Sequence, residues 1–145
     1  MDNNSFKEER VLAIDYGSKR VGLALSDPLK IFAYPYKTIE NSTDLIDKLI
    51  LVIKESSVTK IILGYPLKEN GQKSDSTLMV EKFKEELEAK VSIPIQYWDE
   101  RYSSELAKAN ILASVKSKKK RRNKGLVDQN AASIILQEYL DEAGK

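Results

Sequence analysis

Two apolar segments near the start of the chain, residues 11–14 and 21–25, are separated by an interval too short to hold a helix. The first segment runs into Asp15, and Gly17 follows shortly after it, so the chain is expected to turn back at once. Two strands joined by so short a turn pair antiparallel. The start of the sequence therefore predicts a β-hairpin.

A third strand is predicted over residues 31–39, and its place in the sheet is limited by Pro35. Proline cannot donate a hydrogen bond to a neighbouring strand, so it favours the edge of a sheet or a bulge. We therefore expect this strand at an edge or interrupted by a bulge.

Beyond residue 40, helical and strand spacing of the apolar residues alternate, and Ser42 or Thr43 is placed to cap the first helix. The predicted elements are helix 45–53, strand 60–64, helix 74–91, strand 93–98, helix 103–113 and helix 126–143. An antiparallel start followed by such alternation predicts an α/β fold, a mixed five-stranded sheet with helices on both faces. At 145 residues, a single domain over 1–145 is expected.

Apolar residues at helical spacing predict the buried faces of two long helices. Helix 74–91 is expected to bury Met79, Val80, Phe83, Leu87 and Val91. Helix 126–143 is expected to bury Val127, Ala131, Ile134, Ile135 and Tyr139.

The chain contains no histidine and no cysteine. These residues are the usual ligands of zinc, copper and haem, and histidine is the usual base of nucleophilic triads. Any bound metal is therefore expected to sit on oxygen, as magnesium, manganese and calcium prefer. The first ten residues do not resemble a signal peptide, and no apolar run approaches the ~20 residues that cross a bilayer. We expect a cytoplasmic protein with no membrane association.

Three carboxylates, Asp15, Glu100 and Asp128, are the candidate catalytic and metal-binding residues. Asp15 and Glu100 each follow an apolar strand, and in open α/β sheets ligands gather at the carboxyl ends of strands. Asp15 and Asp128 also have structural explanations. Asp15 could be a turn residue, and Asp128, in the first turn of the last helix, could interact with the helix dipole. Together they would repel one another unless cations neutralised them, and two Mg²⁺ or Mn²⁺ ions about 4 Å apart would also activate a water for attack on phosphorus.

Basic residues are concentrated between Glu100 and Asp128. Residues 116–124 hold seven of the 24 basic residues and no acid, so this run could bind phosphates, although it could also be only a solvated loop. Lys19 and Arg20 in the first turn add positive charge, as does Arg101 beside Glu100. The candidate nucleic-acid-binding residues are Lys19, Arg20, Arg101, Lys118, Lys119, Lys120, Arg121, Arg122 and Lys124.

Glycines flank the candidate site. Gly17 and Gly22 are explained by a tight hairpin or by close approach of a phosphate. Gly64 is expected where a strand ends and enters an irregular loop.

Four stretches of the sequence carry a family resemblance: VLAIDYGSKRVGLALSD, ILGYPLKENG, WDERYSS and VDQNAASIILQEYL. In order and spacing they resemble the YqgF family of Holliday junction resolvases and ribosomal RNA precursor nucleases, over nearly the whole chain. The resemblance implies a ribonuclease H-like fold, with the motif acids on Asp15, Glu100 and Asp128. It also implies maturation of the 5′ end of pre-16S ribosomal RNA, with Holliday junction cleavage as the alternative. Asp27 and Asp99 are the nearby candidates for a fourth acid.

Two other classes of function remain open. An actin-like ATPase lobe shares a similar DxG hairpin, but one domain of 145 residues supplies only half of such an enzyme. A non-catalytic RNA-binding module would need only the basic run. The expected partner is nucleic acid, either precursor ribosomal RNA, within pre-ribosomal particles, or branched DNA. We expect a monomer or a weak homodimer, although a junction resolvase would require a symmetric dimer to cut two strands.

Overall fold

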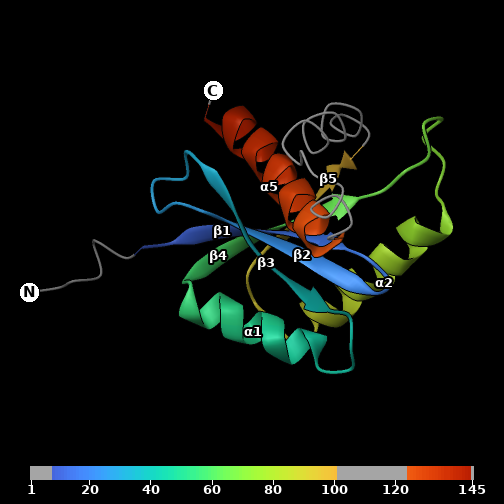
Figure 1. Cartoon of the computed structure of the whole chain (residues 1–145), viewed down its shortest axis with the longest axis horizontal. Coiled ribbons are helices and arrows are strands. Elements are labelled where there is room, and N and C mark those ends of the chain that lie inside the picture. The colour runs from blue at the N-terminus through green and yellow to red at the C-terminus, as the bar shows by residue number, and fades with distance from the viewer. Residues whose placement is uncertain (1–7, 101–123, 145) are drawn as a thin grey trace, which may run out of the picture.

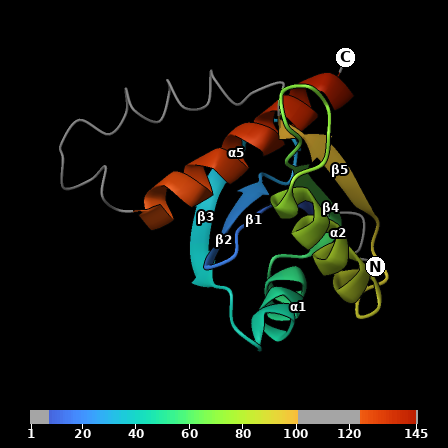
Figure 2. The same cartoon turned by 90° about the vertical axis from the view of Figure 1, so that its right-hand side faces the viewer.

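The computed structural model describes residues 8–100 and 124–144, which form a five-stranded sheet with helices on both faces (Figures 1 and 2). The strand order is β3-β2-β1-β4-β5. The elements are β1 (Arg10–Tyr16), β2 (Arg20–Ser26), β3 (Ala33–Glu40), α1 (Leu45–Glu55), β4 (Val58–Tyr65), α2 (Asp75–Glu88), β5 (Ile95–Asp99) and α5 (Lys124–Ala143).

The sheet is mixed, as predicted. β1 pairs antiparallel with β2, and β2 with β3, because short turns join these strands. β1 pairs parallel with β4, and β4 with β5, because α1 and α2 carry the chain back between them. α1 and α2 lie on one face of the sheet and α5 lies on the other (Figure 2). The carboxyl ends of β1, β4 and β5 therefore meet at one edge.

The two faces of the sheet bury separate apolar layers, because successive side chains on a strand point to opposite faces. On the α1 and α2 side, the core includes Leu12, Ile14, Leu23, Leu63 and Phe83. On the α5 side it consists of Val11, Ala13, Ala24, Ile62, Ala132, Ile135, Leu136 and Leu140. The strands next to α5 contribute small residues such as Ala13 and Ala24, which allow that helix to lie close to the sheet.

β3 is an edge strand, as Pro35 predicted. Pro35 lies opposite Ala24, next to a shift in the pairing register between Leu23 and Ala24. The proline thus occupies an edge strand and a bulge at once, the two places where its missing donor is tolerated.

Three sequence predictions about the helices were wrong in detail. α1 is preceded by Asp44 at the N-cap, without a side-chain capping bond, and neither Ser42 nor Thr43 takes that place. In α2, Met79 is 39% exposed while Thr77 is buried, because the Thr77 hydroxyl donates to the carbonyl of Pro66 and completes a capping box with Ser74. α2 ends at Glu88, three residues before the predicted end.

The buried face of α5 was predicted only in part, because Ile135 is buried as expected but two other expected residues are not. Ala131 and Ile134 are only partly buried, and the sheet is faced by Ala132, Ile135, Leu136 and Leu140. This stripe continues towards the N-terminus to Asp128 at helical spacing. The face that docks on the sheet is therefore the one that carries the candidate aspartate. The predicted helix 103–113 and the side chain of Val127 lie outside the described residues.

No helix in the described ranges combines the length and the apolar character needed to cross a membrane.

Candidate active site

Asp15 lies near the carboxyl end of β1, in the centre of the sheet. It follows Val11 and Ala13 in the alternation of the strand, so it faces α5. Its partner across the antiparallel pair is Gly22 of β2. The aspartate is thus part of a strand ladder rather than a turn, and the turn explanation of this residue does not apply.

Gly22 brings α5 onto the sheet next to Asp15. A Cβ atom at Gly22 would lie 2.3 Å from the backbone oxygen of Asp128 and 2.9 Å from the backbone nitrogen of Gln129. Only a residue without a side chain allows this approach. The tight hairpin is therefore only part of the reason for a glycine at position 22. Gly22 also allows Asp128 to lie beside Asp15.

Glu100 follows β5 and reaches back across β4. A Cβ atom at Gly64 would lie 2.7 Å from Glu100 Oε1, so the missing side chain of Gly64 creates the space that the carboxyl group fills. There the carboxyl groups of Glu100 and Asp15 share a hydrogen bond. Two acids that are 85 positions apart in the printed sequence therefore meet at the carboxyl edge of the sheet.

The acidic pair is electrostatically unfavourable when both groups are charged. Burial raises the pKa of Glu100 to about 8, and the negative charge of Asp15 adds to the increase. Burial also raises the pKa of Asp15 to about 6, with a further increase from the charge of Asp128. Near neutral pH the pair therefore retains a proton between its oxygens. A divalent cation would neutralise both groups better than one proton, so the donor set fits Mg²⁺ or Mn²⁺.

Asp128 lies close to this pair, but its carboxylate binds an arginine. Its Oδ2 accepts a hydrogen bond from Nε of Arg20 at 3.1 Å. Among the described residues, no three acidic side chains lie close enough together to hold one metal ion. α5 begins at Lys124, so Asp128 lies beyond the first turn, and the helix-dipole explanation of this residue is wrong.

The other candidate residues are distributed as follows. Lys19 is exposed in the turn before Arg20, and Lys124 is the first residue of α5. Asp27 lies at the opposite end of β2 and caps the backbone of the next loop, whereas Asp99 adjoins Glu100 and contributes to its raised pKa. Lying outside the described residues are Arg101, Lys118, Lys119, Lys120, Arg121 and Arg122.

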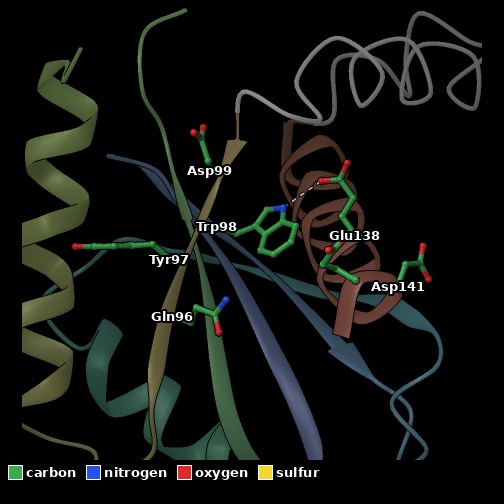
Figure 3. Close-up of a pocket in the computed structure, with 7 residues that line it drawn as sticks. Gln96, Tyr97, Trp98, Asp99, Glu138 and Asp141 are labelled. Atoms are coloured by element: carbon green, nitrogen blue, oxygen red, sulfur yellow. Dashed lines mark hydrogen bonds between the residues drawn. The ribbon is translucent and has the colours of Figure 1, made fainter. Parts of the chain in front are cut away.

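An acidic cavity lies between β5 and α5 (Figure 3). Its volume is about 620 Å³, and its described lining residues are Gln96, Tyr97, Trp98, Asp99, Glu138, Asp141 and Glu142. Trp98 points towards α5, where its Nε1 donates to Glu138 at 3.2 Å, while Tyr97 points to the other side of the strand. Four carboxylates without a basic side chain among these residues would repel a phosphate backbone, so this cavity is not a suitable path for nucleic acid.

This arrangement, a mixed five-stranded sheet between helices, is a ribonuclease H-like fold. The same fold occurs in Thermus thermophilus RuvC, solved in complex with a Holliday junction substrate. The two chains superpose with a TM-score of 0.62 at 12% identity, over 94% of this chain and 97% of RuvC. The fowlpox virus resolvase superposes with a TM-score of 0.57 at 12% identity, over 94% and 99% of the two chains. The predicted fold class is confirmed.

The chain belongs to the RuvX family, described as Holliday junction resolvases, whose family model matches residues 9–142. A Chlorobium phaeobacteroides protein named "Putative pre-16S rRNA nuclease" is 44% identical over 141 residues, 94% of each chain. A Porphyromonas gingivalis protein of the same name is 45% identical over 133 residues, 91% of this chain and 96% of that one. The predicted family is confirmed, and so is the class of enzyme, a nuclease that hydrolyses phosphodiester bonds.

Proposed function

We propose that this protein is a metal-dependent nuclease that matures the 5′ end of pre-16S ribosomal RNA. The observation that carries the proposal is the partly buried Asp15 and Glu100 pair at the carboxyl edge of the sheet, which needs a cation to be fully ionised. The names of the relatives supply the substrate.

Asp15 and Glu100 would bind the metal, and Asp128 would complete the site as a third ligand. When bound, two Mg²⁺ or Mn²⁺ ions would neutralise charge on the scissile phosphate and lower the pKa of an attacking water. Gly64 keeps Glu100 in place, and Gly22 sets the height of Asp128 above the sheet. Arg20 restrains Asp128 through its hydrogen bond and lies at the start of β2, beside the β1–β2 turn.

The charges around the site indicate where the nucleic acid would lie. The cavity on the β5 side is lined by carboxylates, whereas Lys19 and Arg20 lie on the β2 side. We therefore propose that the substrate backbone approaches over the β1–β2 turn and the start of α5. The basic run 116–124 overlaps the start of that helix in the sequence and would add phosphate contacts.

A paired cleavage assay tests this proposal. Purified protein with Mg²⁺ or Mn²⁺ is given a pre-16S RNA carrying its 5′ extension and, separately, a four-way DNA junction. We expect cleavage of the RNA, and its loss in Asp15→Asn and Glu100→Gln. Asp47→Asn, an exposed acid of α1 on the opposite face of the sheet, is the matched control and should cleave normally. RNA binding without metal-dependent cleavage would instead support a binding module.

Holliday junction cleavage is the second candidate function, because the family model carries that description. It would require two active sites in a symmetric dimer. Junction cleavage with no cleavage of the RNA, by a protein that sediments as a dimer, would replace the first proposal. We propose a cytoplasmic location in either case.

A further inference from the structure

Exposed apolar side chains are concentrated on one loop and strand far from the carboxylates. Of the eight large hydrophobic side chains exposed in the described ranges, five lie within residues 29–36. Leu29 is 77% exposed, and Phe32 and Tyr34 are more than half exposed. Contiguous apolar surface on a soluble protein commonly marks an interaction site.

The loop borders a groove with apolar walls. The groove has a volume of about 490 Å³ and lies between the β2–β3 loop, the starts of β1 and β4, and the C-terminal end of α5. Val11, Leu29, Tyr139 and Leu140 line it, together with Lys30 and Lys60. No acidic residue is among its described lining residues. The groove is therefore apolar and positively charged.

The charge of Lys60 is held at the groove by an aromatic ring. Its Nζ lies 4.9 Å from the centroid of the Tyr139 ring, within the range of a cation–π interaction. The ammonium group is thus fixed next to apolar side chains. This arrangement suits a ligand that combines a carboxylate with an apolar side chain.

Hydrogen bonds hold the loop in its exposed conformation. The Asp27 carboxylate accepts from the backbone nitrogens of Ile31 and Phe32 at 2.8 and 2.9 Å. Gln137 of α5 accepts from the backbone nitrogen of Ala33 and donates to the carbonyl of Ile31. The apolar side chains are therefore presented to solvent by a fixed backbone, which lowers the entropic cost of binding a partner.

The groove and the carboxylate pair lie at opposite ends of the sheet. The β2–β3 loop projects beside the C-terminal end of α5, on the left of Figure 1. Asp15, by contrast, pairs with Gly22 near the start of β2, and Asp128 lies towards the N-terminal end of α5. A partner in the groove would leave the carboxylate edge open to nucleic acid.

The chemistry of the groove indicates which kind of molecule it can bind. Pro35 removes a backbone donor from the β3 edge, which disfavours addition of a strand from another chain. Two lysines among apolar walls provide too few phosphate contacts for a nucleic-acid path. We propose that this groove binds a segment of a partner protein in which leucine or aromatic side chains alternate with aspartate or glutamate. The apolar side chains pack on Leu29 in the groove and on Phe32 of the adjoining loop, and a carboxylate pairs with Lys60.

Peptide selection on the full-length protein tests the proposal. A random peptide library is selected on the wild type and counter-selected on the double variant Leu29→Ser/Phe32→Ser, after circular dichroism has verified that the variant is folded. We expect enrichment of peptides that combine Leu, Phe or Trp with Asp or Glu. The absence of enrichment against the double variant, or enrichment of basic peptides, would overturn the proposal.

An enriched peptide is then labelled and titrated by fluorescence anisotropy. We expect Lys60→Glu to weaken binding at least tenfold. The control Leu51→Ser changes an apolar residue of α1 that is 56% exposed, close to the 55% of Phe32, and should leave binding unchanged. Equal affinity for Lys60→Glu would refute the charge pairing. Two further measurements distinguish other occupants: loss of RNA binding in the double variant would identify a nucleic-acid surface, and conversion of a wild-type dimer to a monomer would identify a second copy. Either result would overturn the proposal.

Discussion

Replacing Gly22 with alanine tests the packing that places Asp128 beside Asp15. The new methyl carbon would lie 2.3 Å from the backbone oxygen and 2.4 Å from the backbone carbon of Asp128. Non-bonded carbon atoms prefer about 3.5–4.0 Å, so α5 must move by roughly 1 Å at this point. The atoms that clash belong to the helix backbone and cannot rotate away as a side chain could.

We expect the substitution to lower both the stability and the cleavage rate. Overpacking of a close contact costs about 1–3 kcal/mol of unfolding free energy, because the surrounding layer resists displacement. Asp128 moves together with the helix, and a displacement of about 1 Å in an active site can lower the rate about 100-fold. We therefore expect Gly22→Ala to be a folded protein of moderately reduced stability whose cleavage rate falls about 100-fold, a loss that mild destabilisation alone would not produce.

The assay combines urea denaturation, followed by circular dichroism, with single-turnover cleavage of the pre-16S substrate at a temperature where both proteins are folded. The matched control is Gly144→Ala, whose methyl group would lie 3.3 Å from the carbonyl oxygen of Leu140 at the far end of α5. We expect the control to behave like the wild type. Wild-type stability and wild-type rate in Gly22→Ala would refute the proposed contact between β2 and α5.

Three further predictions concern the Asp15 and Glu100 pair and the basic run 116–124. Gly64→Ala places its methyl group 2.7 Å from Glu100 Oε1 and 3.1 Å from Ile135 Cδ1; these side-chain ends can move, so cleavage should fall while the urea midpoint changes little. A large fall in the urea midpoint together with the loss of cleavage would contradict this prediction. Because burial raises the pKa of Asp15 to about 6 and of Glu100 to about 8, above their unfolded values near 4, the folded state binds more protons, and metal-free stability should fall as the pH rises from about 4 to 8. Thermal melts in EDTA and in millimolar Mg²⁺ should therefore differ at pH 8 and nearly coincide at pH 5; an equal effect of Mg²⁺ at both values would be inconsistent with binding at the pair. Replacing residues 118–120 by alanine should lower the salt dependence of RNA affinity by about two to three units of slope, measured by filter binding, whereas an unchanged slope would place the phosphates elsewhere.

The strands and the mixed character of the sheet could be predicted from the sequence because the signals are local. The short interval after Asp15 predicted an antiparallel pair, and Pro35 predicted an edge position or a bulge. Asp15 and Glu100 were recognised because each follows an apolar strand, and parallel strands align their carboxyl ends at one edge of a sheet. The absence of histidine and cysteine directed the interpretation towards oxygen ligands.

Local signals did not specify how α5 lies on the sheet. Its sheet-facing stripe runs from the partly buried Asp128 through Ala132 to Leu136, whereas the spacing favoured Ala131 and Ile134. The orientation depends on the close approach of the Asp128 backbone to Gly22, a contact between segments more than one hundred residues apart. Helical periodicity alone cannot encode such a contact, because several neighbouring faces of α5 are apolar.

By itself, the sequence determined the mixed sheet, the candidate acids and the chemistry that they can support, because strand ends and residue types are local properties. Only the tertiary structure decided which acids meet. It joined Asp15 to Glu100 over Gly64, and it paired Asp128 with Arg20. The physical reason is that backbone approach and ion pairing depend on three-dimensional distance, which packing between distant segments sets.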